Sequence, residues 1–201
     1  MEFSSWLALV AICVVGAISP GPSLAVVMRN TLAGGRAYGV RTAIGHGSGV
    51  GLYALLTALG LALVIANNPV VFNGIRYGGA AFLAWLGIKA LLAKPKAIEQ
   101  SKTQQMVKHR GAFEGFMVAF LNPQLAIFFV ALFSQFVNAN TSWQQSLVMM
   151  VTAGGIDGAW YVLVALVLSR GPVLAWLNAK SLWLDRLSAV VLLALAFTVM
   201  L

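Results

Sequence analysis

One acidic side chain lies in the middle of a long apolar stretch. Asp157 belongs to the segment Gly-Gly-Ile-Asp-Gly at 154–158, and a charged side chain at the centre of a membrane helix costs about 2.5–3.5 kcal/mol. No basic residue lies within a helical turn of Asp157, so we expect it to face the protein interior. An acid that gains and loses a proton there could couple transport to protons. The alternative is a structural role, either protonated or hydrogen-bonded to Asn122.

A histidine lies among glycines in an earlier apolar stretch. His46 stands between Gly45 and Gly47, and further glycines follow at positions 49 and 51. An imidazole titrates at about pH 6.5 in water, so His46 can handle protons; a histidine near a membrane interface also often hydrogen-bonds to loop backbone. The glycines indicate close approach between helices. They are not a dinucleotide signature, because no strand precedes them.

Prolines interrupt two of the apolar stretches, with Ser-Pro-Gly-Pro at 19–22 and Asn-Pro at 122–123. A proline inside a helix removes a backbone hydrogen bond, and in lipid the freed groups need a partner, so such breaks face protein or a wet cavity. The exposed N–H and C=O groups suit carboxylates, ammonium groups or ions. We therefore expect substrate to bind at the breaks, the first of which should open more fully. A simple packing kink is the alternative.

The composition places these residues on membrane helices. Of 201 residues, 60% are hydrophobic and only 9% are charged, whereas a soluble domain carries roughly 25% charged residues. A disordered chain would be polar. The single cysteine, Cys13, excludes a disulfide framework and a multi-cysteine metal site. Because the sequence has no nucleophile–base constellation, phosphate loop or metal-ligand spacing, we expect neither enzymatic activity nor a cofactor.

Apolar windows of about 20 residues, enough to cross a hydrocarbon core of ~30 Å, predict an all-α bundle of six transmembrane helices in one domain, 1–201. The first window has no positive n-region, so we expect it to be retained rather than cleaved as a signal peptide. The last must begin before Asp185 to be long enough. The expected spans are 4–28, 43–66, 70–92, 113–137, 146–168 and 183–201.

The basic residues lie almost entirely on one side of these spans. Twelve of the 13 Lys and Arg residues fall in or near the first, third and fifth loops, and only Arg76 lies near the opposite side. This asymmetry is the positive-inside pattern. It predicts extracytoplasmic termini and a main cytoplasmic loop at 93–112, and it explains the net charge of +8 without a nucleic-acid partner.

The two halves of the chain resemble each other. The segment Pro-Ser-Leu-Ala-Val at 22–26 resembles Pro-Gln-Leu-Ala-Ile at 123–127, and a Thr-Ala pair at positions 42 and 152 opens a glycine-rich stretch with one ionisable residue. A tandem copy of three spans is inverted relative to the first, as in many secondary transporters. Residues 1–92 and 113–201 are therefore candidates for inverted repeats, with chance similarity as the alternative.

Four motifs lie along the chain: Ser-Pro-Gly-Pro at 19–22, Gly-Gly-Arg-x-x-Gly at 34–39, the segment 76–89, and Phe-Leu-Asn-Pro-Gln at 120–124. In combination they resemble the LysE/RhtB family of amino-acid exporters, over essentially the whole chain. The resemblance implies a six-helix exporter of amino acids or close derivatives in the bacterial inner membrane, driven by proton exchange. Family members frequently carry an acidic residue in the fifth span, and the resemblance implies that Asp157 corresponds to it. The broken-helix residues that carry over are Pro20, Gly21, Pro22, Asn122 and Pro123.

Two departures from the family pattern leave the substrate open. Gln124 stands where members often carry Lys, and members often have His or Trp near Tyr53; both positions fall close to the expected pathway, so we add them to the candidate substrate residues. The homoserine and neutral amino-acid branch is nearer than the basic one, because Asp157 is the only deeply placed acid. His46 and Asp157 are the candidates for proton coupling. Small-residue faces would permit a homodimer.

Two other classes of function stay open. A cation or metal exporter of the same superfamily would need clustered carboxylate, histidine or cysteine ligands, and the spans offer only Cys13, His46 and Asp157. A membrane scaffold without transport activity is the other class. An intact bundle with no solvent-reachable cavity would favour the scaffold.

Overall fold

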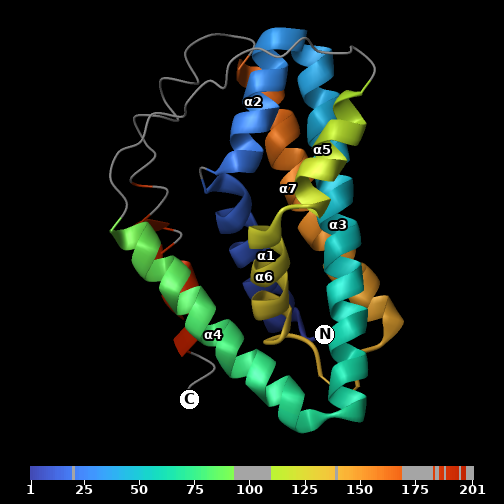
Figure 1. Ribbon diagram of the computed structural model, residues 1–201, viewed down its shortest axis with the longest axis vertical. Coiled ribbons are helices and arrows are strands. Elements are labelled where there is room, and N and C mark those ends of the chain that lie inside the picture. Colours follow the sequence, from blue (N-terminus) through green and yellow to red (C-terminus); the bar gives the residue numbers. More distant parts are fainter. Residues whose placement is uncertain are drawn as a thin grey trace.

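The computed structural model describes residues 1–19, 21–92, 110–138 and 140–168, together with positions 183, 186, 187, 189–194, 196 and 197. All elements with defined bounds in these ranges are α-helices, which confirms the all-α class (Figure 1). They are α1 (Phe3–Ile18), α2 (Pro22–Gly34), α3 (Arg36–Asn67), α4 (Pro69–Leu91), α5 (Gly111–Phe120), α6 (Pro123–Phe133) and α7 (Trp143–Leu168).

Each proline motif ends one helix and starts the next. Pro22 and Pro123 are the first residues of α2 and α6, where the missing N–H costs no helical hydrogen bond. The helix axes bend by 54° between α1 and α2 and by 60° between α5 and α6. The bend at the two-proline motif is thus no larger than the bend at Asn-Pro, and the fuller opening expected at the first motif stays a prediction.

By length and composition, α3 (residues 36–64) and α7 (residues 143–167) can each cross a membrane, and up to four spans result if each bent pair counts as one. α3 begins seven residues earlier than the expected 43, because Gly35 alone makes the turn from α2, with φ at 81°. The described residues between 183 and 197 are helical. Asp185 and most of the expected loop 93–112 lie outside the described residues.

α3 lies at the centre of the bundle, in contact with α2, α4, α5, α6 and α7. α1, α2 and α7 run toward the upper end of Figure 1, whereas α3, α5 and α6 run toward the lower end, and the two helix breaks lie at similar heights. α4 leans away from the bundle at its far end. There it packs on the C-terminal residues, since a Cβ at Gly87 would lie 2.7 Å from the Leu193 side chain.

α3 and α7 touch backbone to backbone. A Cβ on Gly47 would lie 2.7 Å from the carbonyl oxygen of Gly154 and 2.7 Å from Cα of Gly158, and one on Gly154 would lie 2.7 Å from the carbonyl oxygen of Gly47. Small residues at a helix interface allow such approach. α5 meets α3 in the same way, through Gly45 and Gly115. These contacts fix the position of the side chains next to them along α3 and α7.

Gly154 and Gly155 offer a matched test of this contact, because a Cβ at Gly155 would have nothing within 4 Å. We expect Gly154→Ala to force α7 from α3 and to lower the melting temperature in detergent, since overpacking costs about 1–3 kcal/mol. Gly155→Ala should raise it slightly, because alanine is favoured over glycine in helices by about 1 kcal/mol. Equal melting temperatures for the two variants would contradict a backbone contact here.

Candidate functional site

His46 of α3 and Asp157 of α7 form one buried pair. His46 Nδ1 lies 2.6 Å from Asp157 Oδ2, and the residues are 1% and 8% exposed. A buried charge needs a partner, since an isolated ion is expensive in a low-dielectric interior. Asp157 is thus paired with His46 and not with Asn122, and His46 lies nearly three turns inside α3 rather than at a loop. In the described part of the chain, Nε2 of His46 has no hydrogen-bond partner.

Side chains from two further helices surround the pair. The ring of Tyr161 packs edge-on against His46, with 5.0 Å between centroids, and its hydroxyl shares a hydrogen bond with the Ser23 side chain near the start of α2. Cys13 of α1 lies close enough to Asp157 for electrostatic interaction. The first helix break is therefore next to the pair.

The candidate residues of the first break divide into those placed by the structure and one that is not. Gly21 is the N-cap of α2, in extended backbone, and Pro22 is its first residue. Pro20 lies outside the described residues. Because α2 begins here, its first turn presents free backbone N–H groups beside Ser23, a position that favours negative charge.

Tyr53 of α3 packs against aromatic rings on both helices of the second break. The Tyr53 ring lies 5.7 Å from that of Phe120, the last residue of α5, and 6.4 Å from that of Phe129 in α6. Asn122 caps α6, its side-chain oxygen accepting a hydrogen bond from the Gln124 backbone N–H at 3.0 Å. Gln124 itself is exposed. Of the substrate candidates here, Tyr53 contacts the ring of the last residue of α5, and Asn122 already has a structural role.

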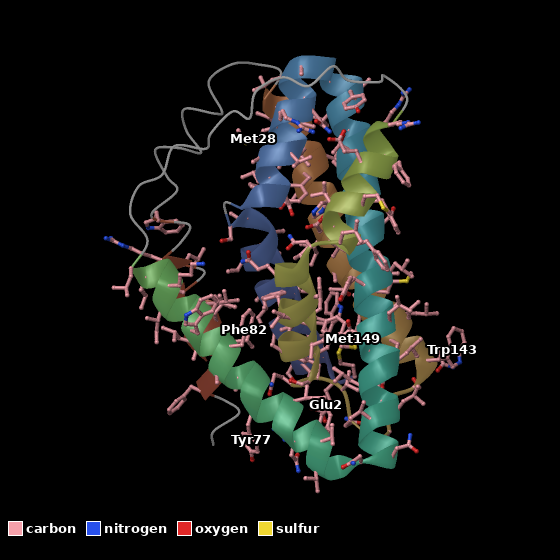
Figure 2. The ribbon with its side chains drawn as sticks, in the orientation of Figure 1. Glu2, Met28, Tyr77, Phe82, Trp143 and Met149 are labelled. Atoms are coloured by element: carbon pink, nitrogen blue, oxygen red, sulfur yellow. The ribbon has the colours of Figure 1, made fainter. Side chains whose placement is uncertain are left out.

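The two breaks are neighbours in space. A Cβ at Gly16, near the end of α1, would lie 3.6 Å from the ring of Phe128 in α6. Along α3, Tyr53 follows His46 by seven residues, or about 10 Å. Figure 2 labels Glu2, just before α1, and Met28, about half-way along α2, and the first break lies between these two levels. The arrangement brings the acid–histidine pair and both helix breaks into the middle of one bundle.

The sequence analysis missed a second charged cluster. Arg29 of α2 forms an ion pair with Glu114 of α5; Asn30 Nδ2 donates to Glu114 Oε2 at 3.1 Å, and the Tyr38 hydroxyl donates to the same oxygen at 3.2 Å. Asn30 Nδ2 also lies 3.1 Å from Thr42 Oγ1. No sequence spacing links these positions. The only available signal was an acidic residue at the start of the expected span 113–137.

The His46–Asp157 pair is closed to solvent in this conformation. A cavity of about 350 Å³ lies instead at the N-terminal ends of α1 and α7. Trp6 lines it and donates a hydrogen bond from its indole to Thr152 Oγ1 at 3.1 Å. The other lining residues are Met1, Phe3, Gln144, Gln145 and Val148. Access to the pair from either end would therefore require movement of the helices.

Helices broken near the centre of an apolar bundle, with a buried ionisable pair beside the break, are features of membrane transporters. Comparison with known proteins agrees with this class. Residues 14–201 match the LysE type translocator family, and the chain belongs to that family.

Relatives of the chain include both characterised and uncharacterised proteins. It is similar to the uncharacterized membrane protein YrhP of Bacillus subtilis, with 31% identity over 157 residues, 74% of this chain and 75% of that protein. A leucine efflux protein of Salmonella typhimurium is 33% identical over 120 residues, 59% of this chain and 57% of that protein. An uncharacterized membrane protein of Vibrio cholerae is 27% identical over 158 residues, covering 78% and 77%. No solved structure matches the chain.

A double-mutant cycle tests whether His46 and Asp157 act as one unit. We expect His46→Gln and Asp157→Asn each to reduce the free energy of unfolding in detergent, and the double variant to lose less than the sum. The coupling energy should be about 0.5–3 kcal/mol, the range for residues in contact. Tyr161→Phe keeps the ring against His46 and leaves the His46–Asp157 contact in place. It therefore serves as a control for a substitution next to the pair that does not break it. Additive effects of the two substitutions would contradict the pair.

Proposed function

We propose that the protein exports a neutral amino acid across the bacterial inner membrane in exchange for protons. The observation that carries this proposal is the buried His46–Asp157 pair beside the first helix break. Family membership supports amino-acid export, and relatives named leucine efflux protein support a neutral substrate. Among the residues that the structure describes, Asp157 is the only buried acid, so a cationic side chain would find few counter-charges.

The first proton on the pair costs little electrostatic energy because it makes the pair neutral, whereas a second proton costs more because it makes the pair positively charged. With one proton between imidazole and carboxylate, the pair has no net charge and keeps a short hydrogen bond. A second proton gives an imidazolium beside a neutral acid, with net charge +1 and a weaker contact. We infer that protons enter and leave through this doubly protonated state. Its positive charge between α3 and α7 would differ in stability from one conformation to another, so each conformation would have a different proton affinity.

The substrate would bind where the pair meets the first break. The free N–H groups in the first turn of α2 suit the substrate carboxylate, with Gly21 and Pro22 holding the turn open beside Ser23. Asp157 interacts with Tyr161, the hydrogen-bond partner of Ser23 in this turn, and would attract the ammonium group when ionised. Pro20, Tyr53, Asn122, Pro123 and Gln124 stay candidates for the rest of the pathway.

The proposed topology is six spans in two inverted repeats. In this interpretation α1–α2, α3 and α4 correspond to α5–α6, α7 and the C-terminal helical residues. The corresponding elements α3 and α7 run in opposite directions (Figure 1), as inversion requires. His46 and Asp157 follow their Thr-Ala pairs by similar distances, so each repeat would contribute one member of the central pair. A homodimer stays a proposal without a contact to support it.

The positive-inside rule orients this bundle. Arg36, Arg41 and Arg110 are exposed at the end where α2 ends and α3 and α5 begin, and basic residues mark the cytoplasmic side. Both termini would then be extracytoplasmic. The cavity at the N-terminal ends of α1 and α7 would open toward that side.

A cation or metal exporter is the second candidate. His46 contacts Asp157, and Cys13 interacts electrostatically with Asp157, but the described residues contain no group of three or more His, Cys, Asp or Glu placed to hold a metal ion. Efflux of a radiolabelled divalent metal and of radiolabelled leucine from the same vesicles would separate the two functions.

Asp157→Asn tests the proposed exchange. Asparagine keeps the size of Asp157 and one acceptor oxygen but cannot release a proton, so we expect efflux driven by a pH gradient to fall at least tenfold in vesicles. Membrane insertion and expression should be unchanged. Glu2→Gln, which neutralises an exposed acid at the start of α1, is the control and should transport normally. Unaltered pH-dependent efflux by Asp157→Asn would refute the proton role.

A further inference from the structure

A polar seam joins α2 to α5 at the end that carries Arg36, Arg41 and Arg110. Its centre is the ion pair of Arg29 and Glu114, whose side chains are 23% and 30% exposed and so are partly reached from outside the bundle. Asn30 is fully buried beneath it. The Asn30 side chain accepts from Arg29 and donates to Glu114, so it links both charged residues.

The two helices of this seam are held very differently. α5 is fixed to α3 by backbone contact, because a Cβ on Gly45 or Gly115 would collide with the carbonyl groups of Ala112 and Thr42. α2 packs on α3 and α7 through apolar side chains, among them Leu24, and through single side-chain hydrogen bonds of Asn30 with Thr42 and of Ser23 with Tyr161. Apolar surfaces can slide over one another, whereas interlocked backbones cannot. If the seam opens, α2 is therefore the helix that moves.

α2 is also bounded by a joint at each end. At its start the chain bends by 54° from α1. At its end Gly35 has φ at 81° and nothing within 4 Å of a Cβ position; this conformation is available mainly to glycine. A helix of 13 residues between two such joints can tilt without breaking its own hydrogen bonds. The tilt would part Arg29 from Glu114 and uncover the path from this end toward Ser23 and His46.

Parting the seam leaves one cation and one anion without their strongest partner. Separating a partly exposed ion pair costs less than separating a buried one, but each charge still loses its compensation. A zwitterion carries both charges that are needed, since its carboxylate can take the place of Glu114 beside Arg29 while its ammonium takes the place of Arg29 beside Glu114. Tyr38 belongs to α3 and remains a donor to Glu114, whereas Asn30 moves with α2 and leaves Glu114 together with Arg29.

We propose that Arg29 and Glu114 form a gate at the cytoplasmic end of the pathway, and that an α-amino acid zwitterion opens it by inserting between them. The inference rests on the proposed function for the identity of the ligand. The gate itself rests on the seam, the two joints of α2 and the buried pair that they cover.

Labelling of a single cysteine in the path tests this proposal without any transport step. In a Cys13→Ala, Ser23→Cys protein, the new thiol replaces a buried hydroxyl between the gate and His46. The reagent is a membrane-impermeant maleimide applied to the cytoplasmic face of inside-out vesicles. We expect slow labelling in this background and at least fivefold faster labelling after Arg29→Gln or Glu114→Gln. Arg36→Gln removes an exposed cation at the same end and should change nothing.

Two further comparisons complete the test. The exchanged pair Arg29→Glu with Glu114→Arg should restore slow labelling, which separates loss of the gate from loss of folding. An equimolar mixture of L-amino acids should accelerate labelling of the background protein. The same amino acids as N-acetyl derivatives, which lack the ammonium, or as amides, which lack the carboxylate, should not.

Slow labelling in both neutralised variants would overturn the gate, even if efflux and its dependence on Asp157 are as proposed. Fast labelling in those variants with no response to amino acids would overturn the zwitterion as the ligand and would count against amino-acid export. A response to N-acetyl derivatives equal to that of the free amino acids would overturn the two-charge insertion.

Discussion

A carboxylate buried in an apolar bundle must have a partner, and the remaining structure is arranged to supply one. Asp157 and His46 are adjacent only because α3 and α7 approach closely enough for backbone contact at Gly47 and Gly154. Bulkier residues at these glycines would separate the two side chains and leave an uncompensated charge. The pair therefore depends on the glycine contacts, because they determine whether the His46 and Asp157 side chains can meet.

The broken helices extend this constraint to both ends of the bundle. The first break places Ser23 and the start of α2 against Tyr161, and hence against the pair, while the second lies beside Tyr53 on the same central helix. A change of charge at the pair can thus act on a helix that has a joint at each end. The polar seam of Arg29 and Glu114 lies at the far end of that helix, so proton binding and gating would share one moving element.

Much of the fold could be predicted from local sequence, but the pairs could not. The proline motifs locate the starts of α2 and α6, and the glycine spacing predicts close helix approach. The start of α3 was misplaced because a single glycine makes the turn at position 35. His46 and Asp157 were each identified by type, yet their contact depends on which faces of two distant helices meet, as does that of Arg29 with Glu114. The roles of the site residues remain predictions.

The most direct test of the account is whether amino-acid movement carries protons through Asp157. Purified protein in liposomes, loaded with leucine and a trapped pH indicator, would report proton entry as leucine leaves. The account predicts a pH change in step with efflux for the unaltered protein. It predicts none for Asp157→Asn. Leucine efflux without any pH change in the unaltered protein, or the same pH change in Asp157→Asn, would contradict the account.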